Sequence, residues 1–139
     1  GEVNKKLEGV ILKTIAAFSN ADGGMLLIGV DDSGEIIGLE RDYESLRGAK
    51  DEFEIHLRNL INRNFGNHFA ASNLKIEFPE LDGLEVCSID IKAAIQPIYL
   101  ETADPNGAKR DKFYVRSGNS SIELKLQEVA PYISDRFML

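Results

Sequence analysis

Two acidic residues, Asp31 and Asp32, directly follow the apolar run Met25–Val30. A continuous apolar run bounded by glycine and aspartate predicts a strand buried on both faces. Two carboxylates at its end would lie at the rim of a sheet, where their oxygens could bind Mg²⁺ or Mn²⁺. The same residues, with Gly34, are also typical of a simple β-turn that needs no metal. The spacing is compatible with both interpretations.

A second group of residues could bind phosphate. The segment from Lys109 to Arg116 holds one anion and four cations within a chain whose net charge is −7. The cations are Lys109, Arg110, Lys112 and Arg116. Phosphate binding depends on cations, and an unpaired base can stack on a ring such as that of Tyr114. The alternative is a solvated loop that leads into an ordinary strand.

Strand alternation predicts that Tyr114 and Arg116 share one face, with Phe113 and Val115 on the opposite face towards the core. The residues that follow, Ser117, Gly118, Asn119 and Ser120, offer backbone and side-chain donors for a phosphate. Equally, they form a good turn. The candidate site for nucleic acid is therefore Lys109, Arg110, Lys112, Tyr114, Arg116, Ser117 and Asn119.

These segments belong to an α+β pattern. Apolar residues at helical spacing predict helices over 3–19, 53–64 and 126–137, and Asp42, Tyr43 and Leu46 indicate the start of another helical region. Strands are expected at 25–30, as a central strand, and at 35–39, 74–78, 86–91, 98–100, 113–115 and 122–124, with a hairpin turn at 81–83 and an exposed loop over 102–111. Asn20 and the pair Gly23-Gly24 are expected to stop the first helix, and the two glycines also permit a tight approach. Because strands and helices do not alternate regularly, we predict a mixed sheet of about five to seven strands with helices near both ends and in the middle.

Length and composition narrow the class of protein. A chain of 139 residues fits one domain spanning 1–139, and its start at Gly1 suggests a fragment of a longer protein. The single cysteine, Cys87, excludes an internal disulfide and a cysteine zinc cluster, which favours a reducing, cytoplasmic location. Apolar runs are too short for a membrane span. A phosphate-binding P-loop and a dinucleotide fingerprint are both absent from the sequence.

Two motifs resemble one known family. The run Lys13–Leu39, with its Phe-Ser-Asn-Ala-Asp-Gly-Gly and Ile-Gly-Val-Asp-Asp-Ser-Gly segments, is similar to the first signature of the Schlafen AlbA-type domain, also called divergent AAA. The run Phe113–Ser121 is similar to the second. The resemblance implies a DNA- or RNA-binding domain, often within a regulatory protein, and in some animal members a metal-dependent ribonuclease.

One departure from the family separates the functional alternatives. The family has an acidic strand before its first helix, and the nuclease members take catalytic glutamates from that region. Here nothing of the kind precedes Val3, so only Asp32, or alternatively Asp31, matches the catalytic set. We therefore expect a nucleic-acid-binding module without a tightly bound metal. The alternatives are a nuclease whose other carboxylates lie upstream of Gly1, and a protein-interaction or homodimerisation domain, which suits the acidic charge.

Overall fold

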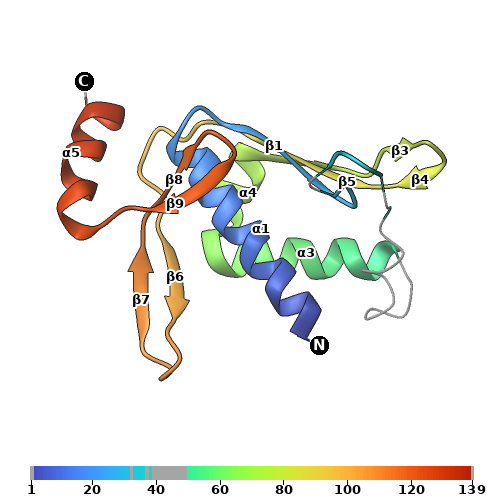
Figure 1. Cartoon of the computed structure of the whole chain (residues 1–139), viewed down its shortest axis with the longest axis horizontal. Coiled ribbons are helices and arrows are strands. Elements are labelled where there is room, and N and C mark those ends of the chain that lie inside the picture. The colour runs from blue at the N-terminus through green and yellow to red at the C-terminus, as the bar shows by residue number, and fades with distance from the viewer. Residues whose placement is uncertain (1, 32, 37, 39–49, 139) are drawn as a thin grey trace.

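Helix α1 (Glu2–Asn20) runs through the middle of the molecule (Figure 1). The computed structural model describes residues 2–31, 33–36, 38 and 50–138. Ile11 and Ile15 are buried on one face of α1, one helical turn apart, as the apolar spacing predicts. The helix predicted over residues 3–19 is confirmed.

A three-stranded antiparallel sheet lies against α1. Its strands are β1 (Gly24–Ile28), β5 (Cys87–Ile91) and β2 (Leu74–Glu77), in the order β1-β5-β2. The central strand is therefore β5. The expectation that the first strand is central and buried on both faces is wrong, because Leu27 is 39% exposed and Met25 more so. Apolar composition does not reveal whether one face or two faces of a strand are covered.

Glycines allow the close approach between α1 and this sheet. Gly23 has a φ of 78°, and a Cβ atom there would lie 2.6 Å from the main-chain oxygen of Ile91. A Cβ atom on Gly24 would lie 2.5 Å from the ring of Phe18. The pair Gly23-Gly24 thus has the tight packing role that its sequence indicates, because any side chain would collide with the backbone or the ring.

Two further helices, α3 (Lys50–Phe65) and α4 (Asn67–Asn73), complete the main core. Their buried side chains pack with those of α1 and β5 in one cluster, which includes Phe53, Leu57, Ile61, Phe69 and Ile89. Helix α4 was not predicted, because its short polar sequence carries little periodicity. The helix start predicted at Asp42, Tyr43 and Leu46 lies outside the described residues.

Three hairpins and a final helix make up the rest of the fold. The hairpins pair β3 (Glu80–Leu81) with β4 (Leu84–Glu85), β6 (Leu100–Ala103) with β7 (Lys109–Lys112), and β8 (Tyr114–Ser117) with β9 (Ser120–Glu123). Helix α5 (Leu126–Phe137) follows. The predicted turn through Asp82 and Gly83 is confirmed, and both residues have positive φ, at 51° and 78°.

The segment 102–111, predicted as a loop, is instead most of a hairpin. Its turn is held by Asp104, whose Oδ1 accepts hydrogen bonds from the main-chain nitrogens of Asn106 and Ala108, both at 2.9 Å. Apart from the buried Leu100, both strands have polar or small side chains that are largely exposed, so they carry no apolar alternation for a sequence pattern to detect.

The α+β class is confirmed, although the strands are grouped differently from the prediction. In place of one mixed sheet, the described strands form a three-stranded sheet and three separate hairpins, and each pairing is antiparallel. Within the described part of the chain, no helix is both long and apolar enough to cross a membrane.

The end of α1 ties the distant parts of the chain together. Asn20 is fully buried, and its Nδ2 donates to the main-chain oxygens of Ile98 and Tyr114, at 2.9 and 2.8 Å. Its Oδ1 accepts from the nitrogen of Ile98 at 2.8 Å, and its main-chain oxygen accepts from the hydroxyl of Tyr132 on α5. One amide therefore fixes α1, β8 and the entry to β6 relative to one another.

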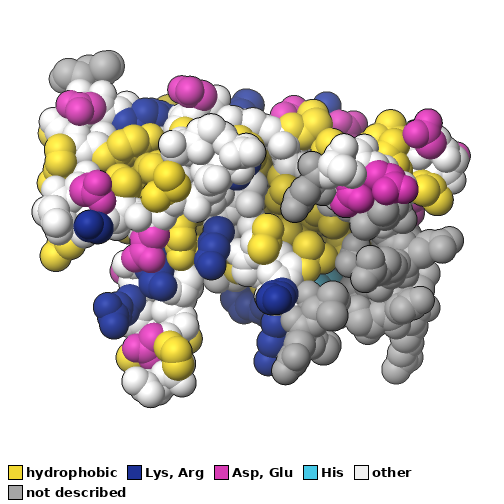
Figure 2. Space-filling view, in the orientation of Figure 1, with side chains coloured by type: hydrophobic (Ala, Val, Ile, Leu, Met, Phe, Trp, Pro, Cys, Tyr) yellow, Lys and Arg dark blue, Asp and Glu magenta, His cyan; other side chains and the backbone are white. Residues whose placement is uncertain are grey.

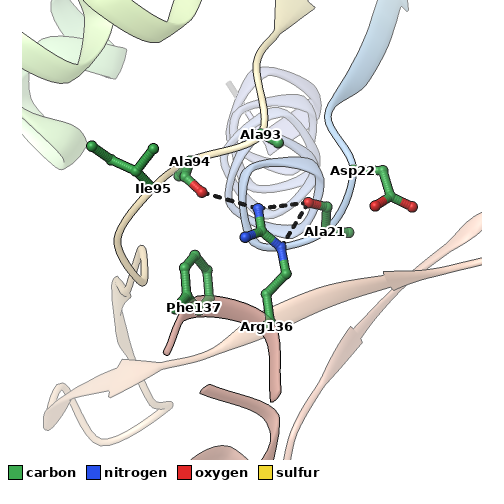
Figure 3. A pocket seen from close by; sticks show the side chains of 7 residues that line it. All are labelled: Ala21, Asp22, Ala93, Ala94, Ile95, Arg136 and Phe137. Carbon is green, nitrogen blue, oxygen red and sulfur yellow. Dashed lines mark hydrogen bonds between the residues drawn. The ribbon is translucent and has the colours of Figure 1, made fainter. Parts of the chain in front are cut away.

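Helix α5 is held mainly by polar contacts, since none of its residues is buried. The guanidinium of Arg136 donates to the main-chain oxygens of Ala21 and Ala94, at 2.8 and 3.0 Å through Nη2 (Figure 3). A cation beside the carbonyl end of α1 is also favoured by the helix dipole. Arg136 and Phe137 line an open pocket of about 580 Å³.

Candidate functional site

The β6–β7 hairpin projects from the body of the molecule as a two-stranded ribbon (Figure 1). Directly paired residues lie on the same face of such a ribbon. Leu100 pairs with Lys112 and Thr102 with Arg110, and these four define what we call the inner face. Leu100 is buried in a cluster with Ala16 of α1, so the inner face is turned towards that helix.

The ribbon separates its charges between two faces. The inner face carries the cations Arg110 and Lys112 and has no acidic residue on either strand. The outer face consists of Glu101, Ala103, Lys109 and Asp111, and there Lys109 Nζ lies 3.8 Å from Glu101 Oε1. Of the cations predicted to act together, the structure brings only Arg110 and Lys112 onto one face.

Each inner-face cation forms a weak ion pair with a nearby carboxylate. Arg110 Nη2 lies 4.0 Å from Asp104 Oδ2 in the ribbon's turn, and its side chain remains 74% exposed. Lys112 Nζ lies 3.8 Å from Glu123 Oε1 on β9. Exposed pairs at such distances contribute about 0–1 kcal/mol. A phosphate could therefore replace either carboxylate at small cost.

Lys13 of α1 reaches the base of the same ribbon. Its Nζ lies 5.9 Å from the centre of the Tyr114 ring, and Tyr114 is paired across the β8–β9 hairpin with Glu123. Glu123 also contacts Lys112. The Tyr114–Glu123 pair therefore lies between Lys13 of α1 and Lys112 of β7. Figure 2 shows Lys and Arg side chains over both the ribbon and α1.

The stacking role expected for Tyr114 does not fit the structure. Its ring is packed with Ala16, Ala17 and Leu100, and the residue is only 5% exposed. This burial, followed by the charge of Glu123, raises the pKa of the Tyr114 hydroxyl. Both faces of β8 are covered. Helix α1 lies on one side, and on the other side Phe113, just before the strand, packs against the rings of Tyr99 and Tyr132. Alternation alone could not reveal the second covering.

Arg116 lies apart from the ribbon's inner face. Its guanidinium is stacked on Phe18 of α1, with the carbon Cζ 4.7 Å from the ring centre, and Nη1 donates to Ser121 Oγ at 3.1 Å. The atom Nε is enclosed and has no hydrogen-bond partner among the described residues. Ser117 and Asn119 are exposed at the β8–β9 turn. Arg116 is thus fixed in position beside these donors.

The possible metal ligands fall in a different place. Asp31 Oδ1 accepts hydrogen bonds from the nitrogen and hydroxyl of Ser33, at 3.0 and 2.6 Å, and from the nitrogen of Glu35 at 2.9 Å. The Ser33 hydroxyl and then the Glu35 amide lower the pKa of this carboxyl. Asp32 lies outside the described residues. Among those described, no three His, Cys, Asp or Glu side chains cluster as a metal site would require. The role of Mg²⁺ or Mn²⁺ stays a prediction.

Sequence reasoning missed the importance of Asn20. The residue was interpreted as a helix stop, and it does end α1, but its side chain also bonds to residues 78 and 94 positions away. No local pattern in the sequence signals such a contact.

The fold and site together define a small α+β domain with a projecting ribbon that carries two cations on one face. The family model described as "Schlafen, AlbA_2" matches residues 1–125, so the chain belongs to this family. The match ends just before α5. A solved structure with the same fold is the DIP2311 protein from Corynebacterium diphtheriae, with a TM-score of 0.58 and 21% identity. The alignment covers 94% of this chain but only 22% of that one.

Proposed function

We propose that this domain binds nucleic acid, DNA or RNA, through the inner face of the β6–β7 ribbon. Membership of the Schlafen AlbA_2 family supports the class of ligand. The observation that carries the proposal is the separation of charge on the ribbon. Arg110 and Lys112 share a face whose two strands bear no acid, and their nearest carboxylates, on Asp104 and Glu123, lie 4.0 and 3.8 Å away.

Three features of the ribbon suit this role. It is exposed, projects from the body, and places two cations where a phosphate backbone can approach. Arg116, Ser117 and Asn119 supply a further guanidinium and polar donors on the adjoining hairpin. The net charge of −7 opposes binding at long range. We therefore expect micromolar or weaker affinity, measured at low ionic strength, where salt screens the contacts between lysine or arginine and phosphate only weakly.

The test is fluorescence anisotropy with labelled single-stranded RNA, single-stranded DNA and duplex DNA at low salt. The variant Arg110→Ala/Lys112→Ala should weaken binding strongly. Each lost phosphate contact should also reduce the slope of log affinity against log salt by about 0.7 to 0.9. Lys109→Ala is the matched control, because it removes a cation from the same strand but from the outer face.

Two results would refute the proposal. One is the absence of salt-sensitive binding of the wild-type protein to each of the three ligands. The other is a double variant that binds as tightly as Lys109→Ala, because the inner face would then have no special role. Either result would favour an interaction or dimerisation domain.

A further inference from the structure

One face of helix α1 leads from its contact with the ribbon to an exposed lysine. Residues Lys5, Gly9, Leu12 and Ala16 follow one another at helical spacing and share one face of α1. The end of this face at Ala16 packs in a cluster with Leu100, from the ribbon's inner face, and Leu12 packs against that cluster. The same face of the helix therefore carries Lys5, which is exposed, further from the contact.

Glu8, an acidic neighbour of Lys5 and Lys6 on α1, contacts another helix. Its Oε2 lies 3.0 Å from His56 Nε2 on α3. Glu8 is thus engaged on the α3 side of the helix. Lys13, in contrast, is on the side of β8, where its ammonium group faces the Tyr114 ring.

An open notch separates the ribbon from α1. Figure 2 shows the ribbon standing away from the helix with a hollow between them, and Lys and Arg side chains over both the ribbon and α1. Each ribbon strand has four residues, so its wall is about 13 Å long. From Lys5 to Lys13 the helix wall measures about 12 Å. These lengths suit a few nucleotides.

We infer that this notch holds one strand of nucleic acid by its phosphodiester backbone, with Lys13 and Lys5 contacting it from α1. The inference rests on the proposed function and adds a second wall, from a segment about 100 residues away, to the ribbon. A backbone between facing cations is neutralised from both sides. The aromatic ring at the base of the notch, Tyr114, is buried, so bases are not read by stacking there. Binding through the phosphodiester backbone alone is therefore tolerant of sequence.

The experiment measures anisotropy with labelled dT15, a mixed-sequence 15-mer and its duplex, using the full chain. Lys13→Ala should weaken binding to both single strands about five- to tenfold at low salt and reduce the salt slope by about 0.7. The double variant Lys5→Ala/Lys13→Ala should reduce the salt slope by about twice as much. Lys75→Ala, which removes an exposed lysine from β2, is the matched control and should bind like the wild type.

A second measurement guards against indirect effects of the substitutions. In the wild-type protein, the oligonucleotide should protect Lys13 and Lys112 from acetylation by an amine-reactive ester, as detected by mass spectrometry, and should leave Lys75 reactive. Thermal unfolding of each variant checks that the fold is intact.

The outcomes distinguish the two proposals. One outcome would overturn the notch but keep the ribbon as the binding site. In that outcome Arg110→Ala/Lys112→Ala loses binding, Lys5→Ala/Lys13→Ala binds like Lys75→Ala, and the oligonucleotide does not protect Lys13. Tighter binding of the duplex than of either single strand would overturn the choice of a single strand. If the wild-type protein binds none of the ligands, both proposals fall together.

Discussion

The side-chain nitrogen of Asn20 lies 2.8 Å from the main-chain oxygen of Tyr114, which is 94 residues further along the chain. This bond is buried, and the same amide, itself fully buried, makes two others to the half-buried Ile98. The amide thus satisfies backbone groups where strand β8 and the segment before β6 meet the end of helix α1.

We predict that Asn20→Ala lowers the free energy of unfolding by about 2–5 kcal/mol, because the substitution leaves buried backbone groups without partners. Urea unfolding followed by circular dichroism gives the value. Asn59→Ala, at an exposed position on α3, is the control and should change stability by about 0.5 kcal/mol or less. A similar small effect for Asn20→Ala would show that water replaces the amide.

A second prediction concerns the attachment of α5. Arg136→Ala removes the donors to Ala21 and Ala94 and leaves the hydroxyl of Tyr132, which donates to Asn20, as the remaining hydrogen bond described between α5 and the end of α1. Hydrogen exchange of the α5 amides should become at least about tenfold faster, because local opening costs less when few apolar contacts oppose it. Amides of the central strand β5 should change little.

The control for α5 is Arg63→Ala, which removes an exposed arginine from the last turn of α3. Its α5 exchange should match that of the wild type. Unchanged α5 protection in Arg136→Ala would mean that the aromatic contacts of Tyr132 suffice to hold the helix.

The turn at Asp31 should give a specific pH dependence. Hydrogen bonds from Ser33 and Glu35 hold the pKa of Asp31 below its ordinary value, so the folded state favours the charged carboxylate. Its stabilising effect is therefore present above the unfolded pKa and is lost as the pH falls through the folded pKa. Asp31→Ala should lower the unfolding temperature at pH 7 and have a much smaller effect near pH 2.

Thermal unfolding of wild type and Asp31→Ala across this pH range is the measurement. Asp111→Ala, an exposed carboxylate on the ribbon's outer face, provides the comparison. An Asp31→Ala effect that is equal at both pH values would show that the ionised carboxylate is not what stabilises the turn.

The amino-acid sequence by itself determined the elements whose information is local. The period of apolar residues in α1, the Gly23-Gly24 pair and the Asp82-Gly83 turn each specify a backbone conformation through neighbouring residues, and each was predicted correctly. The family was also recognisable from two short motifs. Such features depend on local sterics and hydrogen bonds, which a short window of sequence contains.

Only the tertiary structure decided which of the candidate residues act together. Four cations within eight residues look like one patch, yet strand alternation separates Lys109 from Arg110, and α1 holds Arg116 against Phe18. Tyr114 was expected to be free and is buried. Contacts between segments far apart in sequence decide whether a side chain is exposed to solvent, paired with an acid or packed against another helix. A local sequence pattern does not contain the free energy of those contacts.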